Sequence, residues 1–120
     1  MKTVKITEAD KSAPTLTLGV CDQFTTKFLG LMFRNNLEPF GGLIFVEKKP
    51  SIINTSIHMF FMNFDITVLW LDENWLVVDK VLAKKWHPAY SPQKPAKYTL
   101  EIHPERFHDF SIGDTLRLLE

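Results

Sequence analysis

The sequence predicts a mainly β domain: a small antiparallel sheet, barrel-like or compact, with one short helix. Three observations support this class. Apolar residues alternate with polar ones in several short segments, only one segment has a helical period, and turn-forming residues separate the segments. Closure into a barrel, or near closure, would hide the edge strands that an open sheet exposes. An open α+β sheet is the alternative.

The first part of the chain predicts two strands and then a helix. Residues 3–7 and 16–20 alternate between apolar and polar side chains, as half-buried strands do. From residue 23 to residue 33 the period changes, and apolar side chains recur at i, i+4 and i+7. This pattern predicts a short helix that Asp22 can cap.

The middle of the chain predicts buried strands and a hairpin. Residues 43–46 form a short apolar run, and residues 57–64 are apolar on both faces apart from two polar positions, so we expect both segments to be covered on both sides. Residues 66–71 and 75–82 are rich in β-branched and aromatic side chains and flank a short polar turn. They predict an antiparallel hairpin.

The last part predicts a loop, a strand, a brief helix and a final strand. Three prolines within residues 86–95 exclude regular structure there. Residues 97–102 alternate cleanly and predict a half-buried strand. Pro104 fits the first turn of a brief helix. Leu116 and Leu118 predict the last strand.

The composition narrows the possible partners and compartment. The chain has 120 residues, 45% of them hydrophobic, and we expect one domain over residues 1–120, as a monomer or weak homodimer. Fourteen basic and fourteen acidic residues give zero net charge, so we expect neither nucleic acid nor a membrane as partner. A lone Cys21 and a start without a signal-like apolar run predict a cytoplasmic protein.

Several short motifs occur in a fixed order along residues 21–119. They are GLMFR at 30–34 followed by Leu37, GLIF at 42–45, SIHMFFM at 56–62, LEI at 100–102 and GD at 113–114. Together they resemble the motifs of a bacterial and archaeal family called domain of unknown function 192. The resemblance implies a small, mainly β prokaryotic protein, and it brings no established activity, substrate or catalytic residue.

The chain departs from the family pattern at one point. Where the family usually has Pro-Ile-Asp after its central motif, this chain has Asp65-Ile66-Thr67. A hydroxyl therefore stands at the usual carboxylate position, at Thr67, and the acid lies two residues earlier. If that carboxylate has a chemical role in relatives, this chain does not share that role.

Three side chains are candidates for binding a ligand: Arg34, His58 and Glu101. His58 is the only titratable group in a segment that the sequence predicts to be buried. It is either a core histidine bonded to a backbone carbonyl or a functional group. Glu101 lies opposite Leu100 and Ile102, so we expect its carboxylate to point away from the core. Arg34 could form a structural ion pair with Glu101, or the two could hold a small anionic or polar ligand.

A second candidate site lies in the proline-rich loop. This loop carries three ring side chains, Trp86, His87 and Tyr90, although a surface loop has no core in which to bury them. We interpret them as a recognition surface. The histidines and Cys21 have no metal-ligand spacing, so we expect neither a metal nor a cofactor.

Three functions stay open on this basis. The first is a binding module for a small polar ligand or a peptide near Arg34, His58 and Glu101. The second is an enzyme of unknown reaction that uses His58 or Glu101 as acid or base. The third is a structural adaptor whose loop over residues 86–95 contacts a protein.

Overall fold

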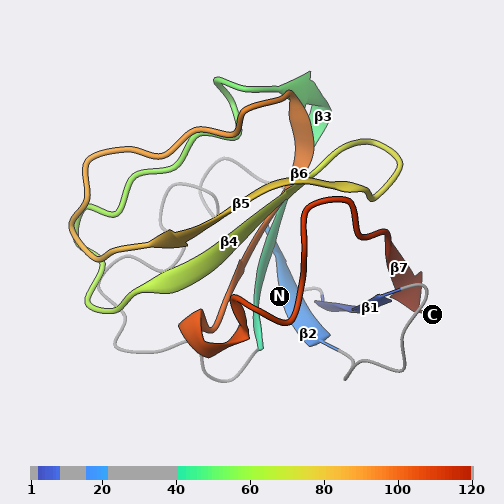
Figure 1. Ribbon diagram of the computed structural model, residues 1–120, viewed down its shortest axis with the longest axis horizontal. Coiled ribbons are helices and arrows are strands. Elements are labelled where there is room, and N and C mark those ends of the chain that lie inside the picture. Colours follow the sequence, from blue (N-terminus) through green and yellow to red (C-terminus); the bar gives the residue numbers. More distant parts are fainter. Residues whose placement is uncertain (1–2, 9–15, 22–40, 120) are drawn as a thin grey trace.

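The computed structural model describes residues 3–8, 16–21 and 41–119, which form a curled sheet of seven strands (Figure 1). The strands are β1 (Thr3–Glu8), β2 (Leu16–Cys21), β3 (Gly42–Ser51), β4 (Ile66–Leu71), β5 (Val77–Ala83), β6 (Ala96–Ile102) and β7 (Leu116–Leu119). Their order across the sheet is β5-β4-β6-β3-β2-β1-β7. The mainly β class is confirmed.

Helical structure is sparse in these residues. The described part of the chain contains one helical element, the 3-10 turn η1 (Pro104–Arg106), where Pro104 opens the turn as predicted. The helix predicted over residues 23–33 lies outside the described residues. Within the described ranges, no helix is long and apolar enough to cross a bilayer.

The strand pairs are antiparallel with one exception. The strands β2 and β3 run parallel, with Leu18 opposite Gly42 and Cys21 opposite Phe45. The predicted antiparallel arrangement holds for the other pairs, and this pair departs from it, because alternation within a strand carries no information about the direction of its neighbour.

One face of the sheet encloses an inner core to which every strand contributes. Its buried side chains are Ile6, Leu16, Leu18, Ile44, Leu69, Leu71, Val77, Leu100, Ile102 and Leu116, joined by Phe110 from the segment before β7. Because residues from all seven strands meet in this cluster, it is the concave side of the curl. Burial of these apolar side chains favours folding.

The other face carries an outer core, which covers only the central strands. It contains Cys21, Leu43, Met59, Met62, Ile66, Val68, Trp70, Ala83 and Ala96. Trp70 is 1% exposed, and its Nε1–H donates to the Thr55 carbonyl at 2.7 Å. The strand β4 is therefore buried on both faces along its whole length.

The predicted hairpin between residues 66–71 and 75–82 is confirmed. The strands β4 and β5 pair antiparallel, with Val68 opposite Val81. The second strand starts at Val77 and not at Trp75, because Trp75 has a φ of 64° and belongs to the turn. Val77 is fully buried, so a charge at this position should cost several kcal/mol.

The sheet nearly closes at the turn of this hairpin. The Val77 N–H donates to the Asp114 carbonyl at 2.8 Å, and the Gly113 N–H donates back to the Val77 carbonyl at 2.8 Å. The Leu116 N–H donates to the Trp75 carbonyl at 2.9 Å. These bonds tie the start of β5, on one sheet edge, to the approach of β7, on the other.

The prediction for residues 57–64 is wrong. The segment is a loop in which Ile57 makes a single isolated bridge to Tyr90. Met59 and Met62 enter the outer core, whereas Phe60 and Phe61 are exposed. A continuous apolar run is compatible with a buried strand, but it does not specify one.

Candidate functional site

His58 lies on the surface and not in a buried strand. It belongs to the exposed part of the loop over residues 57–64. Its Nδ1 accepts a hydrogen bond from the Phe60 N–H at 3.2 Å. An Nδ1 that accepts this bond carries no proton, so the ring proton of the neutral form sits on Nε2, which is left for a ligand.

Glu101 is buried, contrary to the expectation that its carboxylate points away from the core. In register, it lies between Leu43 of β3 and Val68 of β4. Its side chain is 8% exposed, and among the described residues it has no hydrogen bond or ion pair. The pattern correctly puts Glu101 opposite Leu100 and Ile102, but the outer core covers that face as well.

This burial changes the acidity of the carboxyl group. Desolvation raises the pKa of Glu101 from 4.5 to about 7, because an apolar environment disfavours the charged form. At neutral pH the group is therefore protonated in a large share of molecules. A carboxyl group with a pKa near neutrality can both donate and accept a proton at neutral pH, as a general acid or base must.

Glu101 is also fixed by a close backbone approach. A Cβ on Gly42 would lie 2.2 Å from the Glu101 carbonyl oxygen, so only glycine allows β3 to start this close to β6. The backbone of Glu101 is therefore packed directly against the start of β3.

Of the three predicted ligand-binding residues, the described structure contains His58 and Glu101. Arg34 lies outside the described residues, so its pairing with Glu101 stays a prediction. His58 belongs to an exposed loop and Glu101 to a central strand, and no hydrogen bond or ion pair joins them. Across the described ranges, no three His, Cys, Asp or Glu side chains gather to hold a metal.

Thr67, at the position of the family's usual carboxylate, has a structural contact. It is fully buried, and its Oγ1–H donates to the Pro104 carbonyl at 3.2 Å. The hydroxyl therefore attaches η1 to β4. The neighbouring Asp65 accepts a hydrogen bond from the Lys85 N–H at 2.8 Å and lies 3.6 Å from the Lys84 Nζ.

The predicted recognition residues, by contrast, are held together by a backbone ladder. The Trp86 N–H donates to the Met59 carbonyl at 2.8 Å, and the Met59 N–H donates to the His87 carbonyl at 2.9 Å. Ile57 and Tyr90 exchange two hydrogen bonds, each of 2.9 Å. The loop over residues 86–90 is thereby fixed against residues 57–59.

This ladder presents a group of exposed rings. Phe61 and Trp86 meet edge to face, with centroids 5.3 Å apart, and they are 43% and 51% exposed. Phe60 is 42% exposed beside them, and the His87 ring stacks on Tyr90 at 4.3 Å. We call Phe60, Phe61, Trp86 and His87 the aromatic loop surface.

The backbone under these rings is unusual. Phe61 has a φ of 63° and Trp86 a φ of 66°, in the left-handed region that favours glycine. Such conformations cost of order 1 kcal/mol or more each and persist where the surroundings impose them. Both rings of the pair are thus held outwards by strained residues.

The surroundings of this surface are basic. Residues 52–64 and 84–95 contain no aspartate or glutamate, but they include Lys84, Lys85 and Lys94. Asp65, at the base of the two loops, is already engaged by Lys84 and by the Lys85 N–H. A second carboxylate reaches these loops from β5, where Asp79 Oδ2 accepts the Gln93 N–H at 2.9 Å, so the three lysines exceed the neighbouring carboxylates by one.

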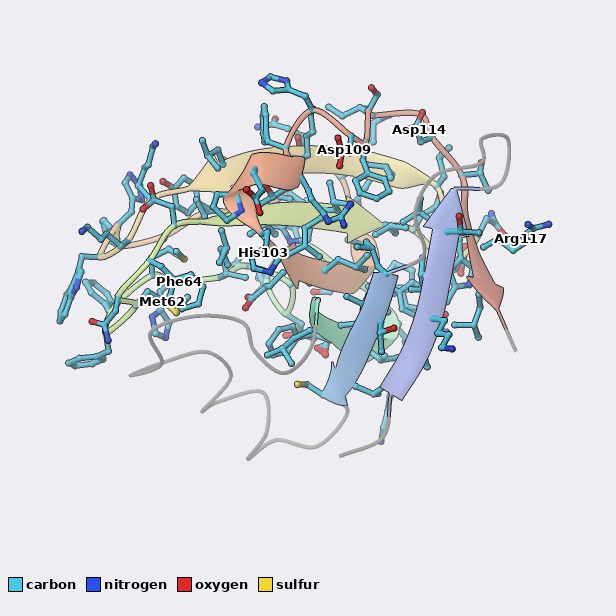
Figure 2. The ribbon with its side chains drawn as sticks, turned by 90° about the horizontal axis from the view of Figure 1, so that it is seen from below. Met62, Phe64, His103, Asp109, Asp114 and Arg117 are labelled. Carbon is cyan, nitrogen blue, oxygen red and sulfur yellow. The ribbon has the colours of Figure 1, made fainter. Side chains whose placement is uncertain are left out.

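The expectation that residues 57–64 are covered on both sides missed the exposed rings of Phe60 and Phe61. The available signal was the run from residue 59 to residue 62, because four consecutive large apolar side chains exceed what one face of a chain can bury. In Figure 2, Met62 and Phe64 mark this end of the molecule, opposite Asp114 and Arg117.

Comparison with known proteins gives archaeal relatives. A UPF0127 protein of Thermococcus kodakarensis is 45% identical over 82 residues, which cover 68% of this chain and 50% of that protein. A UPF0127 protein of Pyrococcus furiosus is 45% identical over 80 residues, covering 67% of this chain and 66% of that protein. The chain thus spans about half the length of the first of these relatives.

The fold occurs in a solved structure as well. A proposed transcription regulator of Sinorhizobium meliloti superimposes with a TM-score of 0.76 at 19% identity, covering 97% of this chain and 92% of that one. At this identity the likeness concerns the fold alone. The model of the DUF192 family, described as an uncharacterized ACR, matches residues 4–118. The expectation from the motifs is confirmed, and the chain belongs to the DUF192 family.

Proposed function

We propose that this domain is a binding module that holds an acidic peptide segment of another protein on the aromatic loop surface. The Phe61–Trp86 pair carries the proposal. The two rings come from different loops, touch edge to face, and are each more than 40% exposed.

The cost of this arrangement supports a role in recognition. A fold that needed only to connect its strands would favour glycine at two positions with positive φ. Here the two positions hold large rings, which forgo part of the burial that they would gain in a core. Strain and exposure at one spot are typical of functional surfaces.

The shape of the surface suits a peptide side chain. Aromatic side chains give a large contact area with few rotamers to immobilise, which is why they dominate the energetics of many interfaces. An apolar side chain of the partner can pack against the edge-to-face pair while its backbone follows the loops. His58, with Nε2 unengaged, lies beside Phe60 and offers a polar contact.

Charge complementarity sets the class of peptide. The loops around the rings carry lysines and no carboxylate, so glutamate or aspartate beside the apolar side chain would be attracted and lysine repelled. The attraction weakens as the salt concentration rises.

The other two hypotheses, a small-ligand site and an enzyme, have less support than the peptide-binding surface. A small polar ligand held by Arg34, His58 and Glu101 has less support, since no hydrogen bond or ion pair joins His58 to Glu101 among the described residues and His58 is exposed whereas Glu101 is buried. Acid-base catalysis by Glu101 has one supporting observation, its raised pKa, but no second polar group is hydrogen bonded to its carboxyl group among the described residues.

The test is a titration followed by nuclear magnetic resonance of the three tryptophan side chains, which variants assign. The probe is a short acetylated peptide with two phenylalanines flanked by glutamates. We expect the Trp86 Nε1–H signal to shift saturably, while the buried Trp70 signal stays in place. Trp86→Ala should lower the affinity by about tenfold or more, as loss of an aromatic anchor does.

Two controls make the result specific. Ile112→Ala removes an apolar side chain that is 59% exposed elsewhere on the molecule, and it should leave the affinity unchanged. A peptide with lysine at every glutamate position should not bind. Equal binding of both peptides, an unaffected Trp86→Ala variant, or association only with anionic lipid vesicles would each contradict the proposal.

A further inference from the structure

The molecule has a cavity at the end opposite the aromatic loop surface. Its volume is about 230 Å³. Its described lining consists of Val4, Val20, Ile44, Val46, Trp75, Tyr98 and Leu118. These side chains continue the inner core towards the turn of the β4–β5 hairpin. Leu118 is 43% exposed and marks the mouth.

The topology separates the two sites. Trp75 lies in the turn that joins β4 to β5, whereas Asp65 precedes β4 and Trp86 follows β5. The turn and the loops therefore lie at opposite ends of the same hairpin, as Figure 1 shows. A ligand in the cavity does not touch the aromatic loop surface.

Two stacked rings form one wall of the cavity. Trp75 and Tyr98 lie nearly parallel, at 17°, with centroids 4.1 Å apart. Trp75 is held in place by its backbone, because its N–H donates to the Asp72 carbonyl at 3.1 Å and its carbonyl accepts the Leu116 N–H. Its φ of 64° shows that a strained residue orients the ring.

The polar atoms of these two rings have no partner in the described chain. Trp70 Nε1–H donates to a carbonyl, and the Tyr90 hydroxyl accepts the Lys84 N–H. By contrast, neither Trp75 Nε1 nor the Tyr98 hydroxyl is hydrogen bonded to any described residue. Both residues are only partly buried, so the partner of each polar atom can be water or a bound molecule.

We propose that the cavity binds a small uncharged aromatic molecule with one hydrogen-bonding group. A dry cavity of about 150 Å³ in another protein accepts benzene, so this larger one has room for a two-ring molecule. Among the described lining residues the tyrosine is the only one with an ionisable side chain, and Lys97 lies outside this lining with its Nζ 5.5 Å from the Tyr98 ring centroid, so a charged ligand would lose its hydration with little compensation. The aromatic wall favours a planar ring, and its free donor or acceptor matches one polar group.

Indole is a suitable probe because it is a neutral two-ring molecule with a single N–H group. In a titration of the intact chain, we expect the Trp75 side-chain signal to shift saturably while those of Trp70 and Trp86 stay in place. Indole-3-acetate, which adds a carboxylate, should bind about tenfold more weakly or worse.

Two variants test the location. Val46→Phe fills the cavity from β3 and should abolish the Trp75 shift. Leu118→Trp covers the mouth from an exposed position, so it needs no space in the core and keeps the test valid if the first variant does not fold. Binding that survives Leu118→Trp, shifts of equal size at all three tryptophans, or no saturable shift in the parent protein would overturn the proposal.

These outcomes are independent of the proposed peptide site. The acidic peptide should move the Trp86 signal and leave Trp75 unchanged, and indole should do the reverse. Failure of either titration leaves the other result interpretable.

Discussion

The two ends of the β4–β5 hairpin each carry a tryptophan with a positive φ, but the two tryptophan rings have different surroundings. At each end a tryptophan sits at positive φ beside an aspartate that binds backbone N–H groups. At the turn end, Trp75 stacks on Tyr98, a residue of a neighbouring strand, and closes part of the inner core. At the loop end, Trp86 meets Phe61, another loop residue, and stays half exposed.

The comparison shows that a strained backbone does not by itself decide what a ring does. Its role depends on what lies beneath it. Over a strand of the sheet, the ring adds to the core and lines a cavity. Over a loop, which reaches the outer core through other side chains such as Met59 and Met62, the ring is presented to the solvent.

The largest expected effect concerns Glu101, which lies in the sheet shared by both ends. Its folded-state pKa of about 7 exceeds the ordinary 4.5, so the folded state keeps a proton that the unfolded chain releases. Stability is therefore full below pH 4.5 and falls as the pH rises towards 7, by about 3 kcal/mol in total. Glu101→Gln should remove this slope and be more stable than the parent at pH 8.

Urea unfolding at pH 4.5 and pH 8 checks this prediction, with tryptophan fluorescence as readout. This expectation reverses the loss of stability that a structural Arg34–Glu101 ion pair predicts for the same variant. If the parent and the variant show the same pH slope, the carboxyl group does not titrate as its burial implies. If the amides of Trp75 and Trp86 exchange with different pH slopes, the two ends do not unfold together.

The next largest effect separates the two tryptophans. Trp75→Ala should cost about 2 kcal/mol, because the stack on Tyr98 and part of the inner core are lost. Trp86→Ala should cost about 0.5 kcal/mol or less. Both variants place the same small side chain at nearly the same φ, so the backbone contribution cancels between them. Equal losses in chemical unfolding would contradict the comparison.

The smallest effect concerns the two aspartates. Asp72 Oδ1 accepts the N–H groups of Asn74 and Leu76 at 2.8 and 3.1 Å, and Asp72→Ala should cost about 1 kcal/mol. Asp65 accepts one N–H group and forms a partly exposed ion pair, so Asp65→Ala should cost about 0.5 kcal/mol. Asparagine at either position keeps the acceptor and should restore most of the loss. A larger loss at Asp65 would show that the loop end is the more rigid one.

The hairpin and the strand positions were predictable because they depend on local patterns. The β-branched residues of β4 and β5 and the polar turn between them specify a hairpin without reference to the rest of the chain. The same holds for Pro104 at the start of η1.

The errors arise where a property depends on distant residues. Alternation along β6 shows which residues share a face with Glu101, but not that Met59, Met62 and Trp70 build a second core on that face. The cavity was missed for the same reason, since its lining combines Val4 and Leu118 with a turn residue. Positive φ at three large aromatic residues has no signature in a sequence.

The pairing of β1 with β7 has a consequence for the order of folding. Lys5 lies opposite Leu119, and Ile6 lies opposite Leu118, so a strand made early is completed by one made last. Such long-range pairing is slow, because a large loop must be closed before any contact compensates for the lost chain entropy. During synthesis one edge of β1 therefore stays without its partner until β7 is made, and in that interval this edge is open to pairing with another chain.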